Sequence, residues 1–263
     1  MTQTDLLGRR ALVCGSTQGI GRACAEQLAA RGCAVTLLAR NEDRLAEVHE
    51  TLSRDHGADH RTVCADFSAP DAVKNAVTAE IKTAGNLHIL VNNTGGPPGG
   101  KIFDAAPEAF LDAMKMHVVC NQILVQACVP GMRADSYGRI VNIISTSVRE
   151  PIPNLGVSNT TRGAVASWAK TLSKELGPDG ITINNVLPGF TDTARLGSLI
   201  HTRAEREGRG DEDVAQTMRS LIPLGRFAAA DEIANVVTFL CSPAASYVTG
   251  VSLPVDGGRL NSI

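Results

Sequence analysis

The chain has 263 residues, 43% hydrophobic and 20% charged, which is ordinary for a globular protein and enough to bury a large core. Its formal net charge of −2, with the basic residues scattered along the chain, argues against nucleic-acid binding. No apolar run approaches about eighteen residues and the N-terminus lacks a basic segment followed by an apolar one, so we expect no membrane contact, no signal peptide and a cytoplasmic location.

Short apolar runs alternate with longer amphipathic segments along the whole chain. This alternation predicts one α/β domain over residues 1–263, with a doubly wound parallel sheet of about seven strands and helices on both faces. In chain order the expected elements are strand Ala11–Val13, helix Ile20–Arg31, strand Ala34–Ala39, helix Glu42–Arg54, strand Arg61–Ala65, helix Pro70–Thr83, strand Leu87–Val91, helix Pro107–Arg133, strand Arg139–Ile144, helix Asn154–Leu176, strand Ile181–Leu187, helix Asp231–Leu240 and strand Val251–Val255.

One segment, residues 194–225, interrupts the alternation because it is charged, favours helix and contains no strand. Ligands bind outside the carboxyl ends of the strands in sheets of this kind. Since the segment follows the strand Ile181–Leu187, we expect it to cover the ligand crevice as a substrate lid.

A glycine cluster, GSTQGIG, joins the first strand to the first helix. Glycine allows a tight turn and a close approach of the backbone to phosphate, and the N–H groups at a helix N-terminus favour an anion. By itself such a cluster is also compatible with an ordinary strand–helix turn. The residues of the candidate phosphate cradle are Gly15, Ser16, Thr17, Gln18, Gly19, Ile20 and Gly21.

Four further motifs accompany this turn in order: NNTG at 92–95, NVLPG at 185–189, VTG at 248–250 and VDGG at 255–258. With them the chain resembles the short-chain dehydrogenase/reductases over essentially its whole length, and among these the 3-oxoacyl-(acyl-carrier-protein) reductase-like members. The resemblance implies a Rossmann fold and a nicotinamide-dependent oxidoreductase that acts on a small-molecule carbonyl or secondary alcohol.

The resemblance also implies roles in cofactor binding. Asp66 would contact the adenine amino group, and the less favoured alternative is a loop acid that caps the next helix. Asn93 would steady the cofactor side of the sheet, and Thr193 would contact the carboxamide. The other implied cofactor positions are Phe67, Gly95, Ile144, Pro188, Gly189 and Thr191.

The end of the second strand bears on the choice between the two nicotinamide cofactors. A site selective for NAD(H) places an acid there to hold the ribose hydroxyls, but this chain has Ala39 followed by Arg40. Because a guanidinium can grip a 2′-phosphate with two hydrogen bonds, we expect NADP(H) to be preferred over NAD(H). A solvated loop arginine is the simpler alternative.

The catalytic positions depart from the family pattern. Ser145 ends the fifth strand where the family places its serine. The family's tyrosine and lysine positions, thirteen and seventeen residues further on, hold Ser158 and Arg162. The family's asparagine in the preceding long helix is His117. No YxxxK sequence exists in the chain, so three of the four catalytic positions have changed.

These changes have unequal chemical consequences. Arg162 keeps a positive charge and can still hold the cofactor ribose, assist in binding and polarise a carbonyl, but it does not release a proton. Ser158 is a poor general acid because its hydroxyl is far less acidic than a phenol. His117 can supply a proton if it faces the crevice, or it is simply a packed helix residue with no role. We therefore hold three readings open: an NADP(H)-dependent oxidoreductase, a cofactor-binding protein with little turnover that serves as a sensor or assembly subunit, and non-redox chemistry such as that of a lyase or epimerase.

The two long predicted helices, over 107–133 and 154–176, carry apolar residues on more than one face, including Leu124, Val125, Val165 and Trp168. This surplus predicts a homo-oligomer, a dimer or tetramer. The seven cysteines show no metal-ligand spacing, so we expect reduced, buried thiols and no metal. Substrate specificity is expected to depend on 95–103, 148–155 and the lid.

Overall fold

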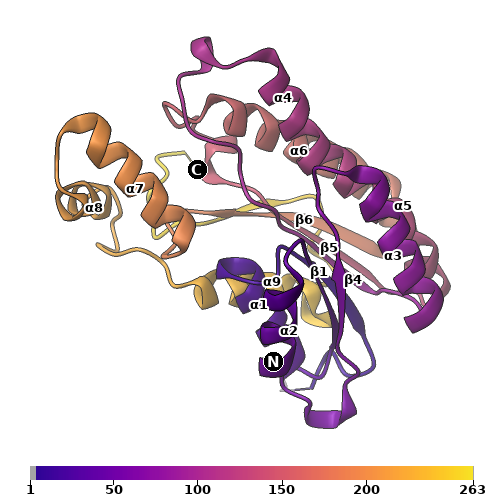
Figure 1. The fold of residues 1–263 in the computed structure, drawn as a ribbon. Coiled ribbons are helices and arrows are strands. Elements are labelled where there is room, and N and C mark those ends of the chain that lie inside the picture. Colours follow the sequence, from indigo (N-terminus) through magenta and orange to yellow (C-terminus); the bar gives the residue numbers. More distant parts are fainter. Residues whose placement is uncertain (1–3, 263) are drawn as a thin grey trace.

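The computed structural model describes residues 4–262, and its centre is a seven-stranded, wholly parallel sheet in the order β3-β2-β1-β4-β5-β6-β7 (Figure 1). Successive strands first run outward from β1 to β3, and the chain then returns to add β4 on the other side of β1. The order therefore reverses between β1 and β4, the position where doubly wound sheets bind their ligands. The strands are β1 (Arg10–Cys14), β2 (Ala34–Ala39), β3 (Arg61–Cys64), β4 (Ile89–Asn92), β5 (Gly138–Ile143), β6 (Ile181–Pro188) and β7 (Ser252–Val255).

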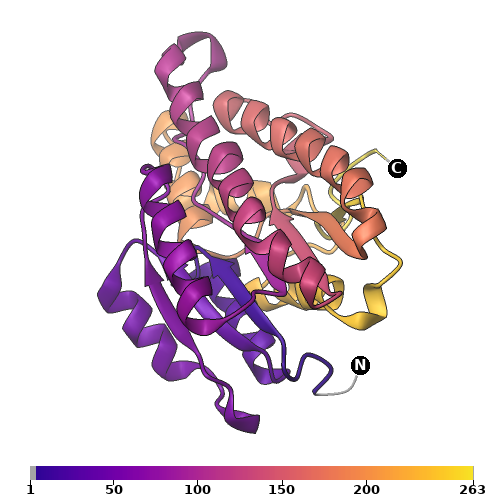
Figure 2. The same ribbon diagram turned by 90° about the vertical axis from the view of Figure 1, so that its right-hand side faces the viewer.

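Helices cover both faces of the sheet, which explains why its central strands are buried at successive positions. One face packs on α1 (Gly19–Ala30), α2 (Glu42–Thr51) and α9 (Ala230–Cys241). The other packs on α3 (Pro70–Ala84), α5 (Cys120–Ala134) and α6 (Gly156–Glu175), and the two layers stand on opposite sides of the sheet in Figures 1 and 2. The predicted doubly wound fold is confirmed.

The long helix expected over 107–133 is not continuous. It consists of α4 (Pro107–Met114), a π-helical turn (Lys115–Val119) and α5. The wider turn changes the helical register and directs the His117 side chain into the interior, where it is 2% exposed. Turns of this kind inside α-helices are frequent at functional sites.

The expected helix Glu42–Arg54 was too long, because α2 ends at Thr51 and a short 3₁₀ turn, Asp55–Gly57, follows. Asn41 begins the helix by accepting the Arg44 N–H at 2.8 Å, as an N-cap should. The remaining predicted elements differ from the observed ones by about one or two residues at their ends, where assignments routinely vary.

The segment 194–225 forms two helices, α7 (Ala194–Glu207) and α8 (Asp211–Arg219), which stand apart from the main layers in Figure 1. Their apolar side chains pack mainly on one another. This separate lid cluster consists of Leu196, Ile200, Ala204, Val214, Ala215 and Met218, with Phe190 and Phe227 against it.

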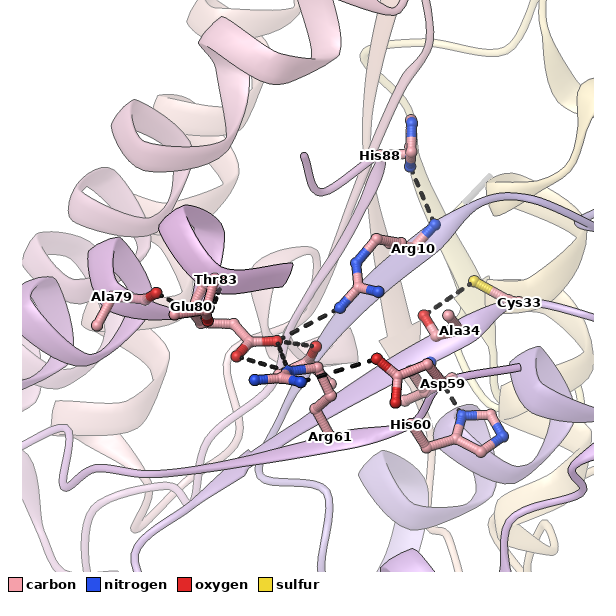
Figure 3. Close-up of polar contacts among 12 residues, drawn as sticks. Arg10, Cys33, Ala34, Asp59, His60, Arg61, Ala79, Glu80, Thr83 and His88 are labelled. Atoms are coloured by element: carbon pink, nitrogen blue, oxygen red, sulfur yellow. Dashed lines mark hydrogen bonds and ion pairs between the residues drawn. The ribbon is translucent and has the colours of Figure 1, made fainter. Parts of the chain in front are cut away.

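A buried carboxylate ties α3 to three strands near their amino-terminal ends (Figure 3). Glu80 is 6% exposed and pairs with Arg10 of β1 at 3.4 Å and with Arg61 of β3 at 3.1 Å. Its Oε1 also accepts a hydrogen bond from Thr36 of β2 at 2.9 Å. We interpret this cluster as structural, because the Glu80 carboxylate accepts hydrogen bonds from Arg10, Thr36 and Arg61 and does not line the pocket at the carboxyl ends of the strands.

Most of the apolar residues that suggested an oligomer are buried within the single chain, and the large apolar side chains that stay exposed on the first segment are Leu111 and Val119. Leu124, Val125 and Val165 are 0–3% exposed within the single chain, and the Trp168 indole N–H donates to Gln122 at 2.8 Å. Association therefore stays a prediction without that support. Among residues 4–262, no helix is both long and apolar enough to span a membrane.

Candidate active site

A pocket of about 540 Å³ opens at the carboxyl ends of the strands, next to the point where the strand order reverses. Its wall is built from the β1–α1 turn, the ends of β2, β3 and β5, the loop after β4, the start of α6, the loop after β6 and the first turns of α7. Segments far apart in the sequence thus meet where a parallel sheet is expected to hold its ligand.

The glycine turn at one end of the pocket leaves no room for larger residues. Gly15 adopts φ of +59°, and a Cβ on Gly21 would lie 2.2 Å from the Gly15 carbonyl oxygen. Asn93 fixes the same turn, because its Nδ2 donates to the carbonyl oxygens of Cys14 and Gly15 at 3.2 and 3.3 Å. The turn is therefore held tightly with the N-terminus of α1 open to the pocket, a geometry that fits the pyrophosphate of a dinucleotide.

Asp66 and Arg40 lie on the wall at the ends of β3 and β2. Asp66 accepts the backbone N–H of Ser68 at 2.8 Å; this bond first, and the charge of Arg40 to a smaller extent, hold the pKa of Asp66 below its usual value. The side chain closes a local turn rather than capping α3, because the N–H that it accepts belongs to Ser68, which precedes the helix. A carboxylate and a guanidinium thus face the pocket where the resemblance places adenosine.

Ser145 lies just beyond β5, and its Oγ accepts the backbone N–H of Ser147 at 3.0 Å. The hydroxyl proton of Ser145 therefore remains free to donate into the pocket. Arg162 comes from α6, is 8% exposed, and donates to the carbonyl oxygens of Ile143 at 2.8 Å and Thr94 at 3.3 Å. Burial, reinforced by the charge of Arg195, lowers the pKa of Arg162 to about 10, so the guanidinium remains charged at neutral pH.

His117 does not reach the pocket wall. Burial lowers its pKa to about 3, with the Arg162 charge adding to the effect, although a hydrogen bond with the Gly95 backbone acts in the opposite direction. The imidazole is therefore neutral at physiological pH. This arrangement does not support His117 as a proton source, and its hydrogen bond with the Gly95 backbone joins the ring to the loop after β4.

Most of the candidate residues meet in this one pocket. Three do not line it: His117, Gly21, which acts through the shape of the turn, and Ser16, whose buried Oγ donates to the Leu38 carbonyl at 3.4 Å. Those that line it are Gly15, Thr17, Gln18, Gly19, Ile20, Arg40, Asp66, Phe67, Asn93, Gly95, Ile144, Ser145, Ser158, Arg162, Pro188, Gly189, Thr191 and Thr193.

Sequence reasoning missed Arg195, which no motif marks and which the first turn of α7 carries to the pocket. It also missed Arg44, which donates to Gln18 of the glycine turn at 3.3 Å. The available signal for Arg44 was its position in the first turn of α2, which begins directly after β2.

The fold and this pocket together define a dinucleotide-binding oxidoreductase, and comparison with known proteins gives its family. The family model described as Enoyl-(Acyl carrier protein) reductase matches residues 15–259. The chain belongs to the short-chain dehydrogenase/reductase family, as the motifs predicted.

Two curated relatives match almost the whole chain. The 3-oxoacyl-[acyl-carrier-protein] reductase FabG of Aquifex aeolicus is 33% identical over 258 residues, covering 97% of this chain and 99% of the relative. The granaticin polyketide synthase putative ketoacyl reductase 1 of Streptomyces violaceoruber is 34% identical over 254 residues, covering 95% and 93%.

Two solved structures share the fold throughout. L-sorbose reductase from Gluconobacter frateurii, in complex with NADPH and L-sorbose, superimposes with a TM-score of 0.93 at 32% identity over 100% of both chains. YwfH, described as an NADPH dependent reductase involved in bacilysin biosynthesis, gives a TM-score of 0.92 at 28% identity over 97% of this chain and 99% of that one.

Proposed function

We propose that this protein is an NADP(H)-dependent oxidoreductase that reduces a carbonyl group, or oxidises the matching secondary alcohol, with Ser145, Ser158 and Arg162 in place of the family's Ser, Tyr and Lys. The observation that carries the proposal is the shared pocket. The free donor of Ser145 and the charged guanidinium of Arg162 open onto the same cavity as the glycine turn.

The preference for NADP(H) rests on Arg40, which follows β2 where a carboxylate would mark an NAD(H) site. The guanidinium can bind a 2′-phosphate in a bidentate manner. Two structures that resemble this chain are described with NADPH, which supports the same choice. When bound, the cofactor supplies the hydride.

At the substrate carbonyl, the Ser145 hydroxyl donates a hydrogen bond to the oxygen, and the Arg162 charge stabilises the negative charge that develops there. None of these groups releases a proton near neutral pH, because the Arg162 pKa stays at about 10 and Ser158 has only an aliphatic hydroxyl. The alkoxide takes its proton from solvent in the pocket. Since general acid catalysis contributes about 10²–10⁴-fold, we expect turnover to be slower than with a tyrosine by up to this factor.

The test is oxidation of NADPH by the purified protein with 3-oxoacyl thioesters, ketones, quinones and sugars as substrates. We expect turnover with at least one class, and a loss of about 10²–10³-fold in kcat on Ser145→Ala, the usual effect of removing one oxyanion donor. NADPH affinity should stay unchanged in this variant. Ser167→Ala, an exposed position on α6, is the matched control and should leave both quantities at the wild-type level.

Tight NADPH binding without turnover on any of these classes would instead favour the second reading, a cofactor-binding sensor or assembly subunit. The combined substitution Ser158→Tyr and Arg162→Lys separates the two readings further. If the combined variant acquires activity that the natural chain lacks, loss of catalysis is the better account. If the natural chain is active, and the two substitutions together raise kcat by no more than about 10²–10⁴-fold, the result supports the oxidoreductase.

A further inference from the structure

Arg195 lies in the first turn of the lid helix α7 and reaches back to the body of the protein. Its Nη2 donates to the carbonyl oxygen of Pro97 at 2.7 Å, in the loop that follows β4. The start of α7 is fixed by Thr193, whose Oγ1 accepts the Leu196 N–H at 3.4 Å. The proposed reaction makes no use of Arg195.

The tips of Arg195 and Arg162 meet beside Gly96. A Cβ atom on Gly96 would lie 3.5 Å from Nη2 of Arg195, 3.7 Å from Nη2 of Arg162 and 3.9 Å from Oγ of Ser158. Two guanidinium groups and one hydroxyl, carried by two different helices, therefore surround a single point on the pocket wall.

No carboxylate neutralises this pair of cations within residues 4–262. Burial lowers the pKa of Arg195, and the pKa of Arg162 falls first through burial and then through the charge of Arg195. Asp66, the acid on the pocket wall, lies near Arg40 at the other end. Two like charges that both lie beside Gly96 repel each other, and an anion bound between them would remove the repulsion.

The hydrogen-bond donors are only partly used. Each Nη2 carries two hydrogens. Arg162 gives one to Thr94 and Arg195 gives one to Pro97, so each retains one for a ligand. With the Ser158 hydroxyl, these N–H groups form a donor set of the kind that a carboxylate accepts.

We propose that Arg162 and Arg195 together hold a carboxylate of the substrate next to the carbonyl that Ser145 polarises, so that the substrates are oxo acids rather than neutral ketones. The identity of the reacting carbonyl rests on the proposed function, whereas the anion site does not. The pyrophosphate of the cofactor is the other anion that this arginine pair could bind. In the proposed function the N-terminus of α1 binds the pyrophosphate. The arginine pair instead lies beside Ser158, which occupies the position of the family's catalytic tyrosine next to the substrate.

The test uses direct binding to the protein saturated with NADP⁺, measured by isothermal titration with two matched pairs of probes, oxamate against oxamide and malonate against malonamide. We expect the charged member of at least one pair to bind about tenfold more tightly or better, the minimum for a charge-assisted site. Arg195→Gln should remove this advantage and Arg195→Lys should keep part of it. Arg206→Gln, at an exposed position on the same helix, is the control with the same loss of charge.

The NADPH dissociation constant of each variant decides the source of the anion. An Arg195→Gln variant that loses NADPH affinity about tenfold while binding the charged probes normally would assign the pair to the pyrophosphate and overturn the proposal. Equal binding of charged and neutral probes by the natural chain would overturn it as well. If the charged probes bind through Arg195 but no oxo acid is reduced, the anion site stands and the proposed reaction fails.

Discussion

The contact between Gly21 and Gly15 makes a single methyl group a severe perturbation. In Gly21→Ala the new Cβ would lie 2.2 Å from the Gly15 carbonyl oxygen and 2.6 Å from Nδ2 of Asn93, where ordinary contacts begin at 3.4 Å. The first of these neighbours is backbone, so the turn and helix α1 would have to separate by about 1 Å, which is enough to break N–H···O bonds at the pyrophosphate.

The expected loss can be worked out from this displacement. Hydrogen bonds to a charged group contribute about 1.5–3 kcal/mol each, so losing one or two should cost about 1.5–6 kcal/mol, or about 10- to 10⁴-fold in NADPH affinity. Overpacking should also destabilise the fold by about 1–3 kcal/mol and lower Tm by about 2–10 °C. NADPH fluorescence titration and thermal unfolding measure the two effects.

Gly163→Ala provides the matched control. Gly163 lies inside α6 with nothing within 4 Å of its added Cβ, so alanine should stabilise the protein by about 0.5–1 kcal/mol and leave NADPH binding alone. An NADPH dissociation constant within threefold of wild type in Gly21→Ala would refute the reasoning that this turn holds the cofactor.

Three further substitutions or conditions test other parts of the structure. Arg40→Ala should weaken NADPH binding about 10- to 100-fold and leave NADH binding unchanged, because only the former carries the 2′-phosphate; equal titration curves for the two cofactors would contradict this. Glu80→Ala should lower the free energy of unfolding by about 3–5 kcal/mol in urea, since Arg10 and Thr36 lose their buried partner, whereas the exposed Glu205→Ala should change it by less than about 0.5 kcal/mol. Folding stability should decrease as the pH falls from about 6.5 toward 3, by about 2 kcal/mol at pH 5 from His117 alone, because the unfolded chain takes up a proton that the buried imidazole, with its pKa of about 3, refuses. His117→Gln should flatten this part of the pH profile, and an unchanged profile would show that the ring is not desolvated.

Much of the fold followed from patterns that depend on local sequence. Apolar runs such as 34–39 identified buried parallel strands, because these strands are covered on both faces. The π-helical turn at 115–119 left no such signal, since the helical spacing on either side of it is regular. The burial of Leu124 and Val165 depends on how α5 and α6 pack together with the sheet, which helical periodicity alone does not define.

The site shows the same division. The meeting of the glycine turn and Asn93 on one pocket wall could be predicted, because glycine spacing and the motif after β4 reflect backbone needs that few other residues meet. The direction of the Ser16 side chain could not, because the carbonyl of Leu38 on a neighbouring strand determines it. Arg195 was invisible for a related reason: only the position of α7 over the pocket, a tertiary feature, brings it to Arg162.

The separate packing of the lid cluster has a kinetic consequence. Because the apolar residues of α7 and α8 contact one another more than the sheet, the two helices can open together as one cooperative unit at a lower free energy than global unfolding. We expect backbone amides in 194–219 to exchange with deuterium sooner than those of β1 or β5, and as a group. An anion that bridges Arg195 to Arg162 would slow this exchange, so the rate at which the unit opens would set how quickly substrate enters and product leaves.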